Sequence, residues 1–369
     1  MIRTPLAAAL ALAGCAAGEP TADPTPSTTP STPTTEPSPP ESAPPSSATP
    51  SASPAEAAPA PVPAVLTWEP TLRPVEETVT TGGGWTIVVD QERSLATIEG
   101  PRTRTVAGDK RFQISDVLLD TAYAVVVKSD GLEEKPAIAT VLDLTTGKSS
   151  IIDGRSDVPT TNGGTWALHG SRLVHATVGD DGAYCLGERD LAMGAADSTW
   201  CADERHGFNN AQVTPAGLTL LGFDDQRPSC RTLGALAGTA LEPFDGVTEC
   251  KGWEGVVTDG GAVWSVIPKD DRLDEARVYA RGPQGELDLG PATAGTLTWC
   301  AGATYFVRDP QTPAEPARLL RWTDDGAFET VYESKGGQAF LSEPRCGGDR
   351  ITISAFAESG DEQVSAPLG

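Results

Sequence analysis

The sequence predicts an all-β protein whose main domain is a β-propeller, and seven four-stranded blades fit it best. Residues 112–153 contain four strand-like runs in a row, and a similar hairpin recurs roughly every 44 residues. No segment keeps the 3.6-residue period of an amphipathic helix, so we expect almost no helix. A repeat of this length that carries four short strands is typical of propeller blades.

The four runs in residues 112–153 are short, rich in β-branched residues and bounded by Asp, Gly and Thr. Such runs between turn residues are strand signals. The expected strands are Ile114–Leu119, Tyr123–Val127, Ile138–Leu144 and Ser149–Ile152.

The hairpin of the first two runs returns along the whole domain. Its turns fall near 82, 120, 169, 215, 259, 301 and 347, at intervals of 38, 49, 46, 44, 42 and 46 residues. Seven hairpins predict seven blades, although six or eight stay possible because the first unit is poorly marked. The last unit ends with its third strand at Gln363–Pro367, so Val65–Glu69 is free to supply the fourth and close the ring. Closure removes exposed strand edges.

One hairpin also carries a known motif. Residues 141–151, VLDLTTGKSSI, follow the pattern A-x-D-x-x-T-G-K-x-x-W, with Val141 in place of Ala and Ile151 in place of Trp. The segment resembles the repeat of PQQ-like propellers, and the domain as a whole resembles PQQ-like and WD40-like propellers. The resemblance implies blade structure. Because Ile151 replaces the docking Trp and no second copy occurs, we expect no quinone and no other cofactor.

The N-terminus indicates export. Residues 1–15 hold one early charge, Arg3, and then a short apolar run, which is a signal peptide rather than a membrane span. The run ends in Leu12-Ala13-Gly14-Cys15, which resembles the lipobox of bacterial lipoproteins. The resemblance implies that Cys15 is lipidated and that the protein is anchored on the extracytoplasmic side of the cell membrane. A secretory signal with a chance cysteine is the alternative.

Residues 16–64 are predicted to be a disordered linker. They contain 15 of the 32 prolines and no Lys or Arg, and they cannot bury enough apolar surface to offset chain entropy. An extended linker of this length reaches on the order of 150 Å at about 3.1 Å per residue. The propeller domain is therefore expected over 65–369.

The charge of residues 65–369 narrows the possible partners. They hold 46 of the 51 acidic and 26 of the 27 basic residues, which gives a net charge of −20. Nucleic acids and anionic membrane surfaces bind basic patches, so we expect neither, and contact with the membrane only through the lipid. A basic protein or another envelope component fits this charge, and we expect a monomer.

Six cysteines follow Cys15, and an even number in an exported domain indicates disulfides. Two of the possible pairs, Cys185 with Cys201 and Cys230 with Cys250, each bracket the hairpin of the two outer strands of one unit. The third pair joins equivalent inner strands of two neighbouring units. The expected disulfides are Cys185–Cys201, Cys230–Cys250 and Cys300–Cys346. No CxxC pair occurs, which argues against zinc or thioredoxin chemistry. His169 and His175 flank one turn, but two ligands are too few to predict a metal site.

The loop from the second to the third strand carries acid in every unit. The predicted acidic face consists of Asp90, Asp130, Asp180, Asp181, Asp224, Asp225, Asp270, Asp271 and Asp309, and in the last unit the loop holds Glu358 and Asp361. In a propeller these loops open on one face, where clustered carboxylates favour a cationic partner. The alternative is that these Asp residues only make turns.

No pattern marks a catalytic residue. There is no G-x-S-x-G elbow, and 46 acids do not single out one facing pair of carboxylates. Three functions therefore stay open. The sequence favours a surface lipoprotein that binds a protein, peptide or envelope component through one propeller face. The alternatives are a hydrolase or lyase with carboxylates in the central funnel, and a structural module of the envelope.

Overall fold

The computed structural model describes residues 55–64, 66–269, 272–336 and 339–369, all in one compact unit. Cys15, the rest of the predicted signal peptide and residues 16–54 lie outside the described residues, as do Asp270 and Asp271. Among the described residues one 3₁₀ turn, Leu273–Glu275, is the only helix, which confirms the expected scarcity of helix. No helix in this part of the chain is long and apolar enough to cross a membrane.

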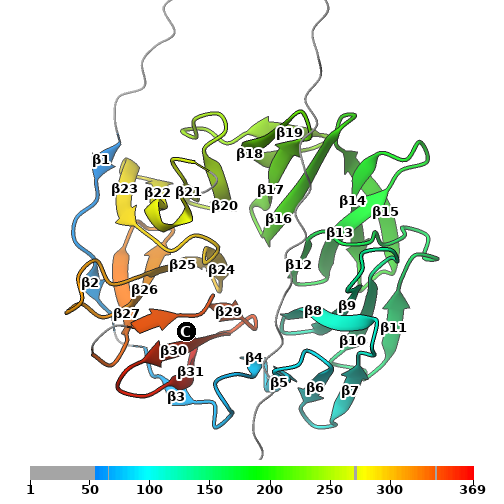
Figure 1. The fold of residues 1–369 in the computed structure, drawn as a ribbon, viewed down its shortest axis with the longest axis horizontal. Coiled ribbons are helices and arrows are strands. Elements are labelled where there is room, and N and C mark those ends of the chain that lie inside the picture. The colour runs from blue at the N-terminus through cyan, green and yellow to red at the C-terminus, as the bar shows by residue number, and fades with distance from the viewer. Residues whose placement is uncertain (1–54, 65, 270–271, 337–338) are drawn as a thin grey trace, which may run out of the picture. The chain divides into compact units, whose positions relative to one another are not determined.

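Seven blades follow one another in a ring, and the strand that begins each blade lies nearest the centre (Figure 1). Within each blade, neighbouring strands run antiparallel. The predicted seven-bladed propeller is confirmed. Blade 1 contains β4 (Thr78–Gly82), β5 (Trp85–Val89), β6 (Leu95–Glu99) and β7 (Arg104–Ala107). Blade 2 contains β8 (Phe112–Leu119), β9 (Tyr123–Asp130), β10 (Ile138–Asp143) and β11 (Ser149–Ile152). Blade 3 contains β12 (Trp166–His169), β13 (Arg172–Val178), β14 (Tyr184–Asp190) and β15 (Ala195–Cys201).

The remaining blades keep this order. Blade 4 contains β16 (His206–Thr214), β17 (Gly217–Asp224), β18 (Arg227–Ala237) and β19 (Ala240–Pro243). Blade 5 contains β20 (Gly252–Thr258), β21 (Gly261–Val266), β22 (Arg277–Gly282) and β23 (Gly285–Pro291). Blade 6 contains β24 (Thr298–Cys300), β25 (Ala303–Arg308), β26 (Arg318–Thr323) and β27 (Phe328–Glu333). Blade 7 contains β28 (Ala339–Leu341), β29 (Arg345–Cys346), β30 (Arg350–Ala357), β31 (Glu362–Pro367) and β3 (Glu69–Pro70).

The four strands predicted for blade 2 are all present, and their ends differ from the prediction by a few residues. Strand β9 shows why the middle strands are apolar without interruption. Val126 packs into the core between blades 1 and 2, whereas Val125 and Val127 pack into the core between blades 2 and 3. Because neighbouring blades cover both faces of a sheet, the usual apolar–polar alternation of a half-exposed strand is absent.

The ring closes through the N-terminal segment. Strand β3 pairs antiparallel with β31, with Glu69 opposite Ser365 and Pro70 opposite Val364. A strand from the N-terminal side thus supplies the fourth strand of blade 7 as expected, but it is Glu69–Pro70 and shares only Glu69 with the predicted segment Val65–Glu69.

The segment before it, residues 55–64, differs from the prediction. We call it the strap: its strands β1 (Glu56–Ala57) and β2 (Val62–Pro63) pair in parallel with β23 of blade 5 and β27 of blade 6. These residues were expected in the disordered linker, and the propeller unit therefore begins earlier than composition predicts. Proline is compatible with an outermost strand, because the N–H groups on its free side need no partner.

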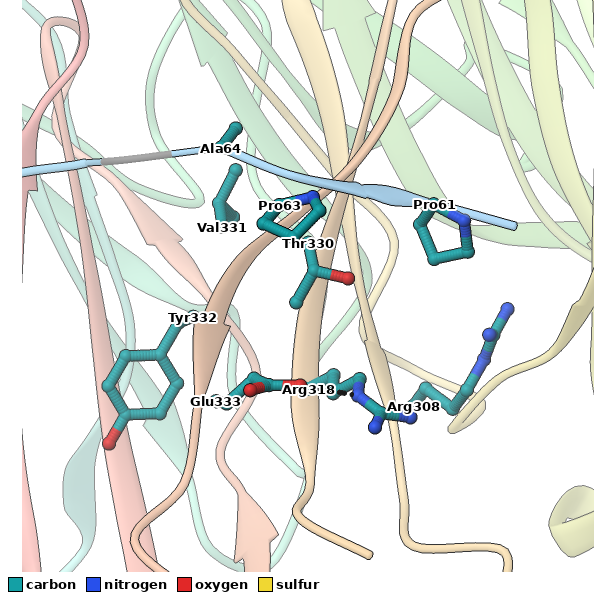
Figure 2. A pocket seen from close by; sticks show the side chains of 9 residues that line it. All are labelled: Pro61, Pro63, Ala64, Arg308, Arg318, Thr330, Val331, Tyr332 and Glu333. Atoms are coloured by element: carbon teal, nitrogen blue, oxygen red, sulfur yellow. Dashed lines mark hydrogen bonds and ion pairs between the residues drawn. The ribbon is translucent and has the colours of Figure 1, made fainter. Parts of the chain in front are cut away.

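A cavity of about 460 Å³ lies beside this pairing and is lined by residues of the strap and of blade 6. Figure 2 shows Pro61 and Pro63 of the strap beside β27, whose Glu333 forms an ion pair with Arg318 at 2.8 Å. Arg308 also lines this cavity, but it donates to the carbonyls of Leu289 and Pro291. These contacts tie blades 5 and 6 together.

All three predicted disulfides are present: Cys185–Cys201, Cys230–Cys250 and Cys300–Cys346. The first joins directly opposed residues of the outer strands of blade 3. The third joins β24 to β29, so it links the inner strands of blades 6 and 7.

Candidate functional site

A cavity of about 740 Å³, the central cavity, lies between the inner strands of the ring. Residues of β4, β8, β12, β16, β24 and β29, with the loops next to them, form its walls. No described residue of blade 5 lines it. The side-chain amide of Gln212 in β16 donates to the carbonyl oxygen of Leu297 at 3.3 Å, so blades 4 and 6 meet in front of β20.

At one end of the cavity the inner turns of several blades are in contact. Asp120, after β8, accepts hydrogen bonds from the backbone N–H groups of Thr121 at 2.5 Å and of Gly170 in the next blade at 2.8 Å. Gly82 and Gly347 approach so closely that a Cβ atom on Gly82 would lie 1.8 Å from the carbonyl oxygen of Gly347. These contacts hold the inner ends of blades 7, 1, 2 and 3 in place.

Asp116 enters the cavity from a β-bulge. The register of β8 with β9 shifts between Ile114 and Asp116, which re-aims the side chains that follow. Burial raises the pKa of the Asp116 carboxyl. A hydrogen bond with Ser115 and the charges of Arg93 and Arg345 offset part of that effect.

Arg93 reaches the same region from the loop between β5 and β6. Its guanidinium donates to the carbonyl of Ser115 at 3.0 Å. Its backbone has φ +55°, a left-handed conformation that costs a non-glycine residue roughly 1 kcal/mol. The backbone of Arg93 also exchanges hydrogen bonds with Asp90 and Ile114, which hold this conformation. The cation is thus placed in the cavity by a strained turn.

Glu343 and Arg345 face Asp116 from blade 7. Glu343 keeps 57% of its side-chain surface accessible because it projects into the open cavity, and its carboxylate lies 4.0 Å from the guanidinium of Arg345. The surrounding protein still restricts its solvation, and this raises the pKa of Glu343, with a further increase from the nearby charge of Asp116. Arg345 opposes these effects. Two carboxyl groups that disfavour ionisation thus share one cavity with two arginines.

Aromatic rings form part of the wall. His169 and Trp299 meet edge to face with their centroids 5.0 Å apart, and His169 Nδ1 lies 3.8 Å from a carboxylate oxygen of Asp120. His175 does not line the cavity: it is buried behind Trp166, which does, and stacks on that ring. Burial lowers the pKa of His175 to about 4. Within the described residues the one cluster with three potential metal ligands is Cys230, Glu249 and Cys250, whose sulfurs form a disulfide.

Glu254 is a third perturbed carboxyl, but it lies behind the cavity. It accepts hydrogen bonds from the backbone N–H groups of Gly295 at 2.9 Å and Leu297 at 3.1 Å. Complete burial raises its pKa to about 7. These bonds fix the loop that leads into β24, so Glu254 supports the wall of the cavity.

The raised pKa of Glu254 makes stability depend on pH. The folded state favours the protonated form of the Glu254 carboxyl. The contribution of Glu254 to the free energy of unfolding is therefore fully present below about pH 4.5 and is lost as the pH rises through about 7. We expect the free energy of unfolding of the wild type, relative to Glu254→Gln, to rise as the pH falls across this range. The upper bound is about 1.4 kcal/mol per unit of pKa difference. Urea unfolding of both proteins at several pH values measures this change, and a difference that does not vary with pH would contradict it.

The predicted acidic-face residues that the structure describes do not line the central cavity, and Asp270 and Asp271 lie outside the described residues. Four carboxylates accept backbone N–H hydrogen bonds within their own turns: Asp90, Asp130, Asp181 and Asp224. Asp130 also forms a 2.7 Å ion pair with Arg111. Asp180 and Asp225 are exposed, and Asp309 is half-buried. The binding of a cationic partner by these loops stays a prediction.

No protein-family model matches this sequence, and no curated protein matches it. Solved structures do. The β-propeller domain of the Trilobed protease from Pyrococcus furiosus is similar with a TM-score of 0.53 and 10% identity, over 79% of this chain and 94% of that chain. The fold is a β-propeller.

Two further structures are more distant. An oligogalacturonate lyase in complex with manganese has a TM-score of 0.49 and 11% identity, over 84% of this chain and 98% of that chain. A prolyl endopeptidase has a TM-score of 0.47 and 11% identity, and this chain spans 50% of its length. At such identities the likeness concerns the fold alone.

Proposed function

We propose that the central cavity is the active site of a hydrolase or lyase that cleaves a carbohydrate chain bearing carboxylate groups. The observation that carries this proposal is the convergence of two carboxyl groups, Asp116 and Glu343, with two guanidinium groups, Arg93 and Arg345, in one cavity.

The two carboxyl groups suit acid–base chemistry. Cleavage of a glycosidic bond needs one group that protonates the leaving oxygen and a second that acts as base or nucleophile. A raised pKa keeps a carboxylic acid protonated closer to neutral pH, where it can donate that proton. Restricted solvation raises the pKa of both carboxyl groups, and the charge of Asp116 raises the pKa of Glu343 further.

The two arginines indicate an anionic substrate. The domain carries a net charge of −20 from the sequence, so its surface repels anions in general. Inside the cavity, protonation of Asp116 or Glu343 leaves a guanidinium without its counter-charge. Such a group binds a carboxylate with two parallel hydrogen bonds. The half-buried ring of Trp299, which lines the cavity, offers an apolar surface for the C–H face of a sugar.

A substrate screen tests this proposal. Linear oligomers of galacturonate, glucuronate and mannuronate are compared with the neutral oligomers of galactose, glucose and mannose. Hydrolysis is followed through new reducing ends, and elimination through the ultraviolet absorbance of unsaturated ends. We expect cleavage of at least one uronate series and much slower cleavage of its neutral counterpart. A protein that cleaves none of these chains would refute the proposal.

Arg93→Ala separates substrate recognition from folding. We expect kcat/KM on the uronate to fall about 10–100-fold, since a hydrogen bond to a charged group contributes about 1.5–3 kcal/mol. Activity on a neutral chain should fall much less, because a neutral chain has no carboxylate for Arg93 to bind. Arg104→Ala, on the exposed outer strand β7, is the matched control and should behave like the wild type. Equal losses on charged and neutral chains would mean that Arg93 does not read the substrate's charge.

A further inference from the structure

A second cavity of about 210 Å³, the side cavity, lies between blades 7 and 1. The segment before β4 and the first residues of that strand form one wall, and β30 forms the other. Glu343 and Arg345 line both the side cavity and the central cavity. Asp116 lines the central cavity only. The two cavities therefore meet at Glu343, and Asp116 lies on the central-cavity side of that boundary.

The lining of the side cavity is polar and has a fixed shape. Ser342, Ser354 and Gln363 form a hydrogen-bonded chain, with Ser342 Oγ accepting from the backbone N–H of Ser354 at 2.9 Å and Gln363 Nε2 donating to Ser354 Oγ at 3.0 Å. Gln363 also donates to the carbonyl of Glu77 at 2.8 Å, which joins blade 7 to the segment before β4. Phe356 adds an aromatic surface. Hydroxyl, amide and aromatic groups in one small pocket suit a hydroxylated ring.

The charge of the side cavity differs from that of the central cavity. Its lining contains three carboxylates and one cation: Glu76, Glu77, Glu343 and Arg345. Acceptors in excess favour a ligand group that donates hydrogen bonds, so the sugar hydroxyls of a chain unit fit better here than its carboxylate.

We propose that the side cavity is a second subsite, which holds the unit of the substrate chain next to the unit in the central cavity. The inference rests on the proposed function and deepens it. The cleaved bond then lies at the boundary between the two cavities, where Glu343 is within reach of the leaving oxygen. Glu343 is accordingly the proton donor, and Asp116 is the partner carboxyl on the side of the central unit. The smallest good substrate is a chain of two units.

Filling the side cavity tests this inference without touching the central one. Thr78 and Val75 line the side cavity and do not line the central cavity. For the uronate that the wild type cleaves, we expect Thr78→Trp to lower kcat/KM on the dimer at least about tenfold, which is about 1.4 kcal/mol. Binding of the monomer, measured by ligand-observed NMR, should stay within about twofold of the wild type. Thr105→Trp on the exposed strand β7 is the control and should change neither quantity.

Val75→Trp, in the loop before β4, repeats the test in case Thr78→Trp does not fold. If both filled variants cleave the dimer like the wild type, the side cavity is not a subsite, although the proposed function stands. If the filled variants lose monomer binding as well, the two cavities are not separate sites and the inference is overturned. If the wild type neither binds nor cleaves any uronate, the proposed function itself fails.

Discussion

Glu343→Gln is expected to lower kcat for cleavage of the uronate chain by about 10²–10⁴-fold, the usual contribution of a positioned general acid or base. Glutamine keeps the shape of the side chain and has no proton to donate to a leaving oxygen. Asp116→Asn should cause a loss of similar size, because it removes the second carboxyl of the pair. Both effects should appear in kcat rather than in KM, since each group acts mainly in the transition state.

The pH profile adds a readout that a purely structural role would not change. The wild-type rate should fall as the pH rises through the raised pKa of the acid, because the group then loses the proton that it must donate. Glu343→Gln should lack this alkaline limb. Asp143→Asn is the matched control, since Asp143 accepts backbone hydrogen bonds from Thr145 and Thr146 in an outer hairpin of blade 2. Full activity in both cavity variants would place the chemistry elsewhere.

The propeller could be predicted because each blade repeats the same short sequence pattern. A short apolar strand, a tight turn and a second apolar strand recur seven times, and the period identifies the unit even where a single strand is ambiguous. The disulfides follow from the same register. Cys185 and Cys201 are directly opposed only if β14 and β15 form one hairpin, as the repeat requires.

The strap could not be predicted, because its composition is that of a disordered linker. Its strands β1 and β2 pair over two residues each, and only the existing edges of blades 5 and 6 give them partners. An extended proline-rich chain has little order of its own, but it loses less entropy than a flexible chain when it lies on a sheet edge. The composition of the strap does not show that the folded propeller offers it a sheet edge to pair with.

The candidate site was missed for a different reason. Asp116 belongs to blade 2 and Glu343 to blade 7, and only closure of the ring brings them into one cavity. The sequence does contain a signal for this site. Asp116 interrupts the apolar run of β8, and Glu343 and Arg345 lie where the inner strand of blade 7 is expected. Charged residues on the innermost strands of a propeller point to the central cavity. The acidic loops carry a more regular sequence signal, although most of their described carboxylates accept turn hydrogen bonds.

Trp68→Ala is expected to lower the free energy of unfolding by about 3 kcal/mol, the lower end of the range for removing a core aromatic, because the side chain is only half-buried. Trp68 immediately precedes β3, the strand that closes the ring. Its indole N–H donates to the carbonyl of Val331 in blade 6 at 2.8 Å, and its ring meets Tyr332 edge to face at 5.3 Å. The hydroxyl of Tyr332 donates to Glu362 in blade 7 at 2.6 Å. Trp68 therefore couples closure of blade 7 to blade 6.

Urea unfolding of Leu72→Ala provides the matched control on the same segment. Leu72 follows β3 and is 91% exposed, so its truncation should change the free energy of unfolding by no more than about 0.5 kcal/mol. Leu72 also has φ +57°, and Leu72→Gly should therefore stabilise the protein slightly, since glycine adopts this conformation without strain. Equal effects of Trp68→Ala and Leu72→Ala would show that the closing segment contributes little to stability. A selective loss in Trp68→Ala would instead mean that the ring depends on this contact between its ends.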